Sequence, residues 1–165
     1  MQADDRRDYE WVFRASFTSI TRTVYLIVHD QAVAEEVTQD AFIKLLGNWS
    51  SIAGYDRPEA WVRKVAIRMA VRHVGREARR PVKEARAQPF RPAVAAAPDP
   101  DVLRAVQQLA PMQRAVVVLH YFEDRPVLEI ARTLQVSEST VKQHLYRARS
   151  RLAQSLGEEV GSDVR

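Results

Sequence analysis

Two segments of the chain concentrate basic side chains of the kind that bind phosphate groups. Residues 60–86 contain nine Lys and Arg residues against two acids, and residues 139–152 contain four bases and no acid. Arginine and lysine neutralise phosphates, and lysine, glutamine and threonine also reach base edges in the major groove. The same composition also fits a basic helix face that is only solvated. The elements around each segment have to show whether it binds phosphate or only faces water.

The second basic segment lies in a pattern that predicts a helix-turn-helix. Helices are expected over residues 102–109 and 112–122, and a third begins at Pro126 after a turn at residues 123–125. A break at residues 135–137 ends with Ser137, a good N-cap for a fourth helix. The buried face of this fourth helix is predicted to hold Val141, Leu145, Ala148 and Leu152. Its other face presents Ser139, Thr140, Lys142, Gln143, Tyr146, Arg147, Arg149 and Arg151. The second helix of such a motif enters the major groove with its first turns towards the bases.

The first half contains an amphipathic helix with an acidic face. Its apolar residues recur at every fourth position, at Val33, Val37, Ala41 and Leu45. Glu36, Gln39 and Asp40 fall on the opposite face. Gly47 and Asn48 supply the stop signal. Upstream, residues 9–28 predict one or two further helices of a small bundle.

The first basic segment predicts another helix, from Glu59 to about Arg80, because Pro58 suits a first helical turn. A loop precedes it and contains Ser50, Ser51, Gly54, Tyr55 and Asp56. The apolar residues expected to face the core are Trp61, Val65, Met69 (or Ile67) and Val71. The basic residues are too many to bury and must face water or phosphate: Arg63, Lys64, Arg68, Arg72, Arg76, Arg79 and Arg80.

A proline-rich stretch separates the two halves. Residues 81–100 hold five of the eight prolines of the chain and show almost no apolar periodicity. Proline fixes φ and removes backbone donors, so this stretch is expected to be an extended, flexible linker. Hairpin signals are missing, and the sequence therefore predicts an all-α protein of two small helical domains. The expected boundaries are 1–80, a linker at 81–100, a helix-turn-helix domain at 101–157, and a tail at 158–165.

Composition argues against several classes of function. Cysteine is absent, and the four histidines, His29, His73, His120 and His144, have no partner at a metal-ligand spacing. The sequence thus predicts no catalytic residue, no metal and no cofactor. The longest strongly apolar run, Ala115–Leu119, is far shorter than the ~20 residues of a membrane span. We therefore expect a cytoplasmic protein with no membrane insertion.

These motifs together resemble the extracytoplasmic-function group of bacterial sigma factors. In the carboxy-terminal half the resemblance lies in residues 129–131, Leu134, 136–137, 140–142 and 147–149. In the first half, residues 34–42 are similar to the polymerase-binding helix of the family, and residues 58–62 with Ala66 and residues 79–80 to its promoter-melting helix. A glycine is usual in the family where Gln135 stands.

The resemblance implies a role for each surface. The acidic helix would dock on the basic coiled-coil clamp of the largest subunit of RNA polymerase, through Glu35, Glu36, Gln39 and Asp40. The minus-ten element would be held and melted by Ser50, Ser51, Tyr55, Trp61, Arg63, Lys64, Arg68, Arg72, Arg76, Arg79 and Arg80. The minus-thirty-five element would be read by Ser139, Thr140, Lys142, Gln143, Tyr146, Arg147 and Arg149. The resemblance implies core polymerase (clamp and flap) and promoter DNA as partners, and it also suggests an anti-sigma factor.

Two alternatives stay open at this point. A regulator with a terminal helix-turn-helix of the LuxR type would share the second motif, although the acidic helix and the basic helix with Trp61 argue against it. An enzyme is a further reading, but the adjacent carboxylates of Glu35 and Glu36 point apart on a helix and cannot share one reacting atom.

Overall fold

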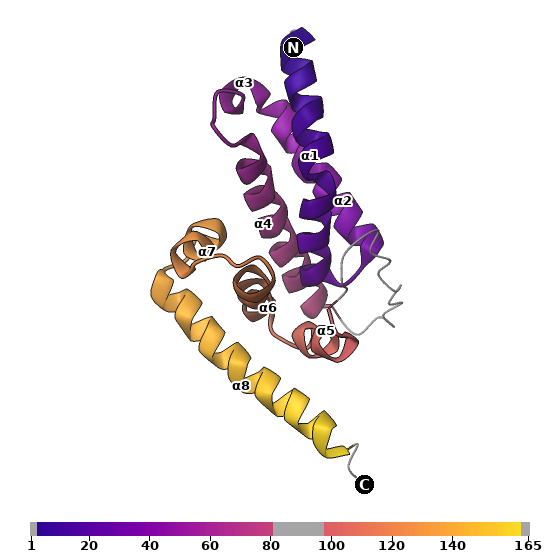
Figure 1. The fold of residues 1–165 in the computed structure, drawn as a ribbon, viewed down its shortest axis with the longest axis vertical. Helices are drawn as coiled ribbons and strands as arrows, with labels where there is room; N and C mark the ends of the chain where they lie inside the picture. Colours follow the sequence, from indigo (N-terminus) through magenta and orange to yellow (C-terminus); the bar gives the residue numbers. More distant parts are fainter. Residues whose placement is uncertain (1–2, 81–97, 163–165) are drawn as a thin grey trace. The chain divides into compact units, whose positions relative to one another are not determined.

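The computed structural model describes residues 3–80 and 98–162, and every regular element within these ranges is a helix (Figure 1). The all-α prediction is therefore confirmed. The chain divides into two compact units, Met1–Gln88 and Pro89–Arg165. Of the helices in the described ranges, none is long and apolar enough to cross a membrane. Most of the predicted linker, residues 81–97, lies outside the described residues.

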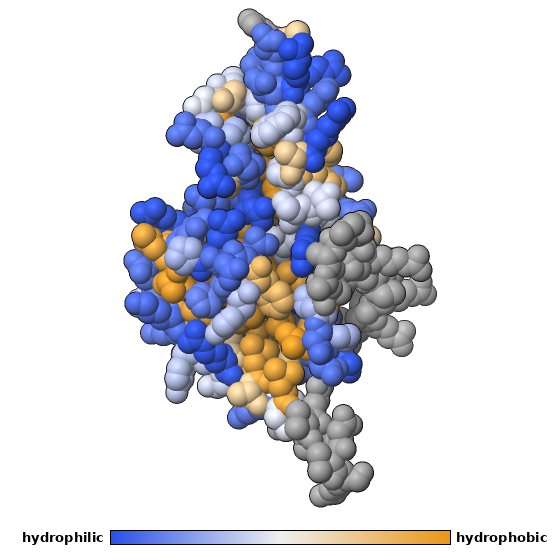
Figure 2. All heavy atoms as spheres, viewed as in Figure 1, coloured by the Kyte–Doolittle hydropathy of each residue, from blue (hydrophilic) through white to orange (hydrophobic). Residues whose placement is uncertain are grey.

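The amino-terminal unit is a bundle of three long helices and one short one. Its elements are α1 (Ala3–Val28), α2 (Gln31–Gly47), α3 (Trp49–Ile52) and α4 (Pro58–Ala78). The long helices α1, α2 and α4 each pack against the other two. Residues 9–28, for which one or two helices were expected, belong to the single helix α1. The first turns of α1 are hydrophilic on the face drawn in Figure 2. In these turns Arg6 pairs with Glu10 at 3.4 Å.

The core of this bundle is formed by large aliphatic side chains closed at one side by aromatic rings. The most deeply buried large side chains are Phe42, Ile20, Ile27, Leu45, Ile67, Val24 and Val62. Phe42 of α2 meets Phe13 of α1 with 4.9 Å between ring centroids. The Tyr9 hydroxyl donates to the Phe42 carbonyl at 3.1 Å, and burial raises the pKa of that phenol. These contacts join α1 to α2, and burial of such rings is a large stabilising term.

The predicted core face of α4 is wrong for most of its residues. Trp61, Val65, Met69 and Val71 are only half-buried, whereas of the predicted set only Ile67 is fully buried. The residues that α4 buries are Val62, Ala66, Ile67, Ala70 and Val74. Helices α1 and α2 both pack on α4, and small side chains such as the buried alanines allow helices to approach closely. The larger apolar side chains are left at the edges of the contact.

Local signals set both ends of α2, and the stop at Gly47 and Asn48 is the predicted one. The Asp30 side chain accepts a hydrogen bond from the Val33 amide at 3.0 Å, which satisfies one free donor of the first turn. The helix ends at Gly47, with Asn48 as the C-cap. His29 is buried with φ 57° at the connection between α1 and α2.

The carboxy-terminal unit contains the predicted helix-turn-helix. Its elements are α5 (Pro100–Gln107), α6 (Pro111–Val117), the π-helical turn η1 (Val118–Phe122), α7 (Val127–Leu134) and α8 (Glu138–Ser162). Helix α8 packs against α5, α6 and α7. The predicted face of α8 is confirmed, because Val141, Leu145 and Ala148 are buried and Leu152 is half-buried.

Several details of this unit differ from the sequence prediction. Residues 112–122 form an α-helix followed by a π-helical turn rather than one helix. Pro126 is the N-cap of α7 and lies before its first residue, and Leu128 of α7 is exposed. The expected linker and tail also overlap helices, since α5 begins at Pro100 and α8 continues to Ser162.

A buried arginine, which the sequence analysis did not single out, closes the turn between α5 and α6. One terminal nitrogen of Arg114 donates to the Gln107 carbonyl and, at 3.3 Å, to the Leu109 carbonyl. Burial lowers the pKa of Arg114 to about 10. The guanidinium stays charged at neutral pH and satisfies carbonyls that the end of α5 leaves without helical partners.

Replacing Gln135 with glycine should stabilise this unit. Gln135 has φ 58° and ψ 45°, and a side chain in this left-handed region costs about 1 kcal/mol, which glycine avoids. We expect Gln135→Gly to raise the free energy of unfolding by up to about 1 kcal/mol in urea denaturation followed by circular dichroism. Asp124→Gly, at φ 51°, is the control and should gain less, because aspartate tolerates this region. A less stable Gln135→Gly protein would contradict the strain argument.

Candidate functional site

The acidic row on α2 is fully on the surface. Glu35, Glu36, Gln39 and Asp40 are all exposed, because Val37, Ala41 and Leu45 on the opposite side of the helix are buried in the bundle. Gln31 donates to Glu35 at 2.7 Å. The two carboxylates of Glu36 and Asp40 are spaced by one helical turn and lie on one face. This row can contact a basic partner without any change in the fold.

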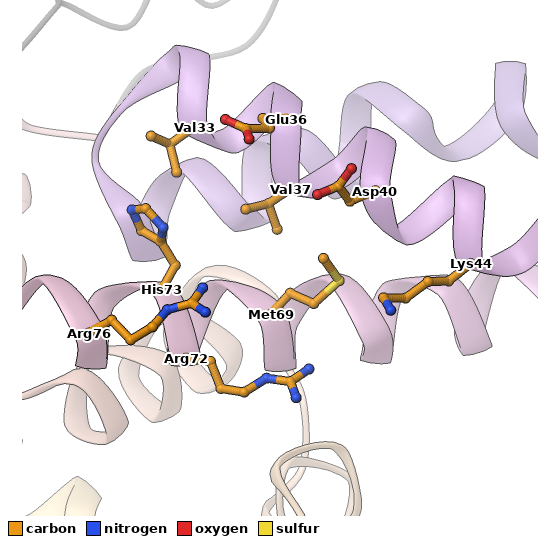
Figure 3. A pocket seen from close by; sticks show the side chains of 9 residues that line it. All are labelled: Val33, Glu36, Val37, Asp40, Lys44, Met69, Arg72, His73 and Arg76. Carbon is orange, nitrogen blue, oxygen red and sulfur yellow. The ribbon is translucent and has the colours of Figure 1, made fainter.

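A groove of about 350 Å³ lies between α2 and α4, and we call it the α2–α4 groove (Figure 3). Its lining residues are Val33, Glu36, Val37, Asp40 and Lys44 from α2, and Met69, Arg72, His73 and Arg76 from α4. Figure 3 shows the carboxylates of Glu36 and Asp40 on one side and the guanidinium groups of Arg72 and Arg76 on the other, with Val37 and Met69 between them. The sequence did not show that the two charged rows share one groove.

The segment between α2 and α4 is only partly a loop. Ser50 and Ser51, which were expected in a loop, are exposed residues of the short helix α3. Tyr55 follows in the connection to α4 and is exposed. Trp49 is 5% exposed and meets Tyr9 edge to face at 5.6 Å, so it belongs to the core. Trp61 is half-buried. Tyr55 is therefore the aromatic side chain of this segment that is free to stack on a base.

The basic residues of α4 are not equivalent. Arg63 donates to Thr23 at 3.1 Å and to Ser19 at 3.0 Å, so its guanidinium is bonded to α1. Lys64 and Arg68 are half-buried. Arg72, Arg76, Arg79 and Arg80 are exposed, and Arg80 pairs with Glu77 at 3.1 Å. From the sequence, all of these residues are expected to face water or phosphate, whereas in the structure they lie in different surroundings.

The first turns of α8 present a polar and basic surface. The Ser137 hydroxyl accepts a hydrogen bond from the Thr140 amide at 3.1 Å, which confirms the predicted N-cap. Thr140 itself is half-buried. The exposed residues of this face are Ser139, Lys142, Gln143, Tyr146, Arg147, Arg149 and Arg151, and Tyr146 is 74% exposed. Helix α7 ends at the break at Gln135, and the cap at Ser137 fixes the start of α8, which carries this face.

A contact missed by the sequence analysis fixes one arginine of this surface. The Nε of Arg149 donates to the Tyr121 hydroxyl at 2.5 Å, and its guanidinium carbon lies 5.7 Å from the centroid of the Tyr121 ring. Tyr121 comes from η1, and π-helical turns often occur at functional sites. No spacing rule links residues so far apart, so only the fold brings them together.

The histidines do not form a metal centre. Within residues 3–80 and 98–162, no group of three or more metal-ligating side chains comes together. Desolvation, with the nearby charge of Arg147, lowers the pKa of His144, so its imidazole is neutral at pH 7.

Comparison with known proteins assigns both units to one family. Residues 13–80 match the family described as Sigma-70 region 2, and residues 101–152 match Sigma-70, region 4. The RNA polymerase sigma-E factor of Streptomyces coelicolor is 30% identical over 154 residues, which cover 90% of this chain and 86% of that protein. The ECF RNA polymerase sigma factor SigM of Mycobacterium tuberculosis is 27% identical over 165 residues, which cover 94% and 80%. The chain belongs to the extracytoplasmic-function group of the sigma-70 family.

The sigma factor is therefore a transcription initiation factor and not an enzyme, and the LuxR-type alternative is not supported. Its fold is similar to that of the sigma factor RpoE of Bartonella quintana, solved in complex with the anti-sigma factor NepR. The TM-score is 0.68 with 18% identity, and the match covers 92% of this chain and 98% of that chain.

Proposed function

We propose that this sigma factor docks on core RNA polymerase through the exposed row Glu35, Glu36, Gln39 and Asp40 of α2. All four side chains are exposed on one short stretch of a helix whose other face is held in the bundle. The resemblance of residues 34–42 to the polymerase-binding helix of the family points to the basic coiled-coil clamp of the largest subunit. The carboxy-terminal unit would make a second contact, with the flap.

The minus-ten element is assigned to the segment from α3 to the end of α4. Tyr55 is exposed and supplies a ring on which an unpaired base can stack. Ser50 and Ser51 lie exposed on α3, with Trp61 at the start of α4. Lys64, Arg68, Arg79 and Arg80 would contact the phosphates of the opened strand, and Arg63 would support them by its bonds to α1.

The minus-thirty-five element is assigned to α8. The observation that carries this assignment is the exposed polar face that begins directly after the Ser137 cap, since the first turns of a recognition helix meet the bases. Lys142 and Gln143 would contact base edges. Thr140 and Ser139 would contribute hydroxyl groups, and Tyr146, Arg147 and Arg149 would flank the duplex.

Substitutions in the first turns of α8 should change the specificity for the minus-thirty-five sequence, whereas a substitution one turn later should not. We expect Lys142→Ala or Gln143→Ala to weaken promoter binding by about 1–3 kcal/mol, and only when the minus-thirty-five sequence is the preferred one. Arg147→Ala, one turn later, is the comparison and should weaken binding uniformly and reduce the salt slope by about one unit. Electrophoretic mobility shifts of the holoenzyme on matched and scrambled elements measure both effects. An equal loss of affinity on both sequences for Lys142→Ala and Gln143→Ala would refute the recognition-helix assignment.

In the proposed division of labour, the amino-terminal unit docks on polymerase and recognises the minus-ten element. The carboxy-terminal unit, which begins at α5 and includes the whole of α8, recognises the minus-thirty-five element. The cytoplasm, where core polymerase is found, is the proposed location. An anti-sigma factor is a further proposed partner, because the family resemblance suggests one. Such a partner would compete with core polymerase for this chain, which a competition binding assay with labelled sigma factor measures.

A further inference from the structure

The α2–α4 groove carries charges of both signs that do not neutralise each other directly. Glu36, Asp40 and Lys44 line one wall, and Arg72, His73 and Arg76 line the other, with Val37 and Met69 between them (Figure 3). Across the described part of the chain, no ion pair joins these carboxylates to these arginines. All four side chains are exposed, so each can contact a partner.

The two charged rows have the same spacing along their helices. Glu36 and Asp40 are four residues apart on α2, and Arg72 and Arg76 are four residues apart on α4. Residues at this spacing are neighbours on one helix face, about 5–6 Å apart. A partner helix laid in the groove would meet the carboxylates of Glu36 and Asp40, followed one turn later by Lys44, on one side, and two guanidinium groups on the other, with apolar contacts beneath it.

The two carboxylates make this groove less favourable for DNA than a purely basic groove, although Lys44 also lines it. A phosphate group that approached Arg72 or Arg76 in the groove would also approach the carboxylates of Glu36 and Asp40, and like charges in juxtaposition cost free energy. Arg79 and Arg80 do not line the groove, so the same objection does not apply to them. A protein segment with side chains of both signs satisfies both walls.

We infer that the α2–α4 groove holds one segment of core RNA polymerase that places basic side chains against Glu36 and Asp40 and acidic side chains against Arg72 and Arg76. The inference rests on the proposed docking of polymerase through α2, and it moves Arg72 and Arg76 from the minus-ten surface to the polymerase interface. The arginine wall adds specificity, because a purely basic segment would be repelled by it.

The test measures binding of the full-length sigma factor to purified core polymerase in the absence of DNA. Because an exposed ion pair contributes about 0.2–1 kcal/mol, loss of two pairs in Arg72→Ala/Arg76→Ala should weaken core binding by about two- to thirtyfold. Arg72→Glu/Arg76→Glu should weaken it further. The matched control is Arg14→Ala/Arg22→Ala, which removes two exposed arginines of α1 and should change core affinity less than twofold.

Each other outcome overturns the inference. Unchanged core affinity with weaker promoter binding by the saturated holoenzyme would make Arg72 and Arg76 DNA contacts. Tighter core binding would mean that Arg72 and Arg76 make no contact with polymerase and only weaken its attraction to the nearby carboxylates. An equal loss in the control would show a net-charge effect. Failure of the α2 docking proposal itself is distinct, because charge reversal at Glu36 and Asp40 would then leave core binding unchanged.

Discussion

Charge reversal at Glu36 and Asp40 is expected to abolish stable binding to core polymerase. Both side chains are exposed on one helix face, and Glu36→Lys/Asp40→Lys replaces two attractive contacts with a basic partner by two repulsive ones. Like charges placed opposite each other at an interface cost several kcal/mol, so we expect at least a hundredfold loss of affinity, or about 2.7 kcal/mol. Fluorescence anisotropy with labelled sigma factor and purified core polymerase measures the loss.

The control for this variant keeps the change in net charge but moves it to α1. Asp8→Lys/Glu10→Lys alters two exposed acids of the same unit and should leave core binding within a fewfold of the wild type. The α2 variant should also keep its thermal stability, because neither carboxylate is buried or joined to Arg72 or Arg76 by an ion pair in the described structure. Wild-type affinity in the α2 variant would remove the docking assignment.

Truncation of Phe42 is expected to have the largest effect on stability. Its side chain is 1% exposed and contacts the rings of Tyr9, Phe13 and Phe17. Phe42→Ala removes this packing and leaves a cavity between α1 and α2, which should cost about 3–5 kcal/mol of the free energy of unfolding of the amino-terminal unit. Urea denaturation of the full chain, followed by tryptophan fluorescence, measures the change, because Trp49 lies in the same core.

The neighbouring residue provides the matched control for this core substitution. Ile43 is 64% exposed, so Ile43→Ala should change the free energy of unfolding by no more than about 0.5 kcal/mol. A comparable loss of stability at both positions would contradict the burial argument. Because α2 also carries the acidic row, Phe42→Ala should reduce polymerase binding in proportion to the fraction of unfolded protein.

Regular spacing and local capping made much of this fold predictable. The period of Val141, Leu145 and Ala148 correctly marked the buried face of α8, and Ser137 correctly marked its start. The left-handed backbone at Gln135 follows from its position in the break, where a glycine is usual in the family. Such features depend on residues close in the sequence, so they can be inferred without knowledge of the partner helices.

The face of α4 could not be inferred in this way. The sequence contains two overlapping apolar patterns, one with Trp61, Val65 and Met69 and one with Val62, Ala66 and Ala70. Side-chain size favours the first pattern, but two helices approach α4 closely, and small side chains allow that approach. Packing of three helices thus selected the second pattern.

The sequence by itself determined the helical class, the order of the helices, and the acidic and basic character of their outer faces, because each depends on local periodicity and composition. Only the tertiary structure brought Arg149 against Tyr121, bonded Arg63 to α1, and placed Arg72 and Arg76 across one groove from Glu36 and Asp40. Those relations join residues far apart in the chain, and the angle and register at which helices pack decide them. Side-chain type shows which groups can bind phosphate or carboxylate. Packing decides which of these groups remain available to a partner and which are bonded within the protein.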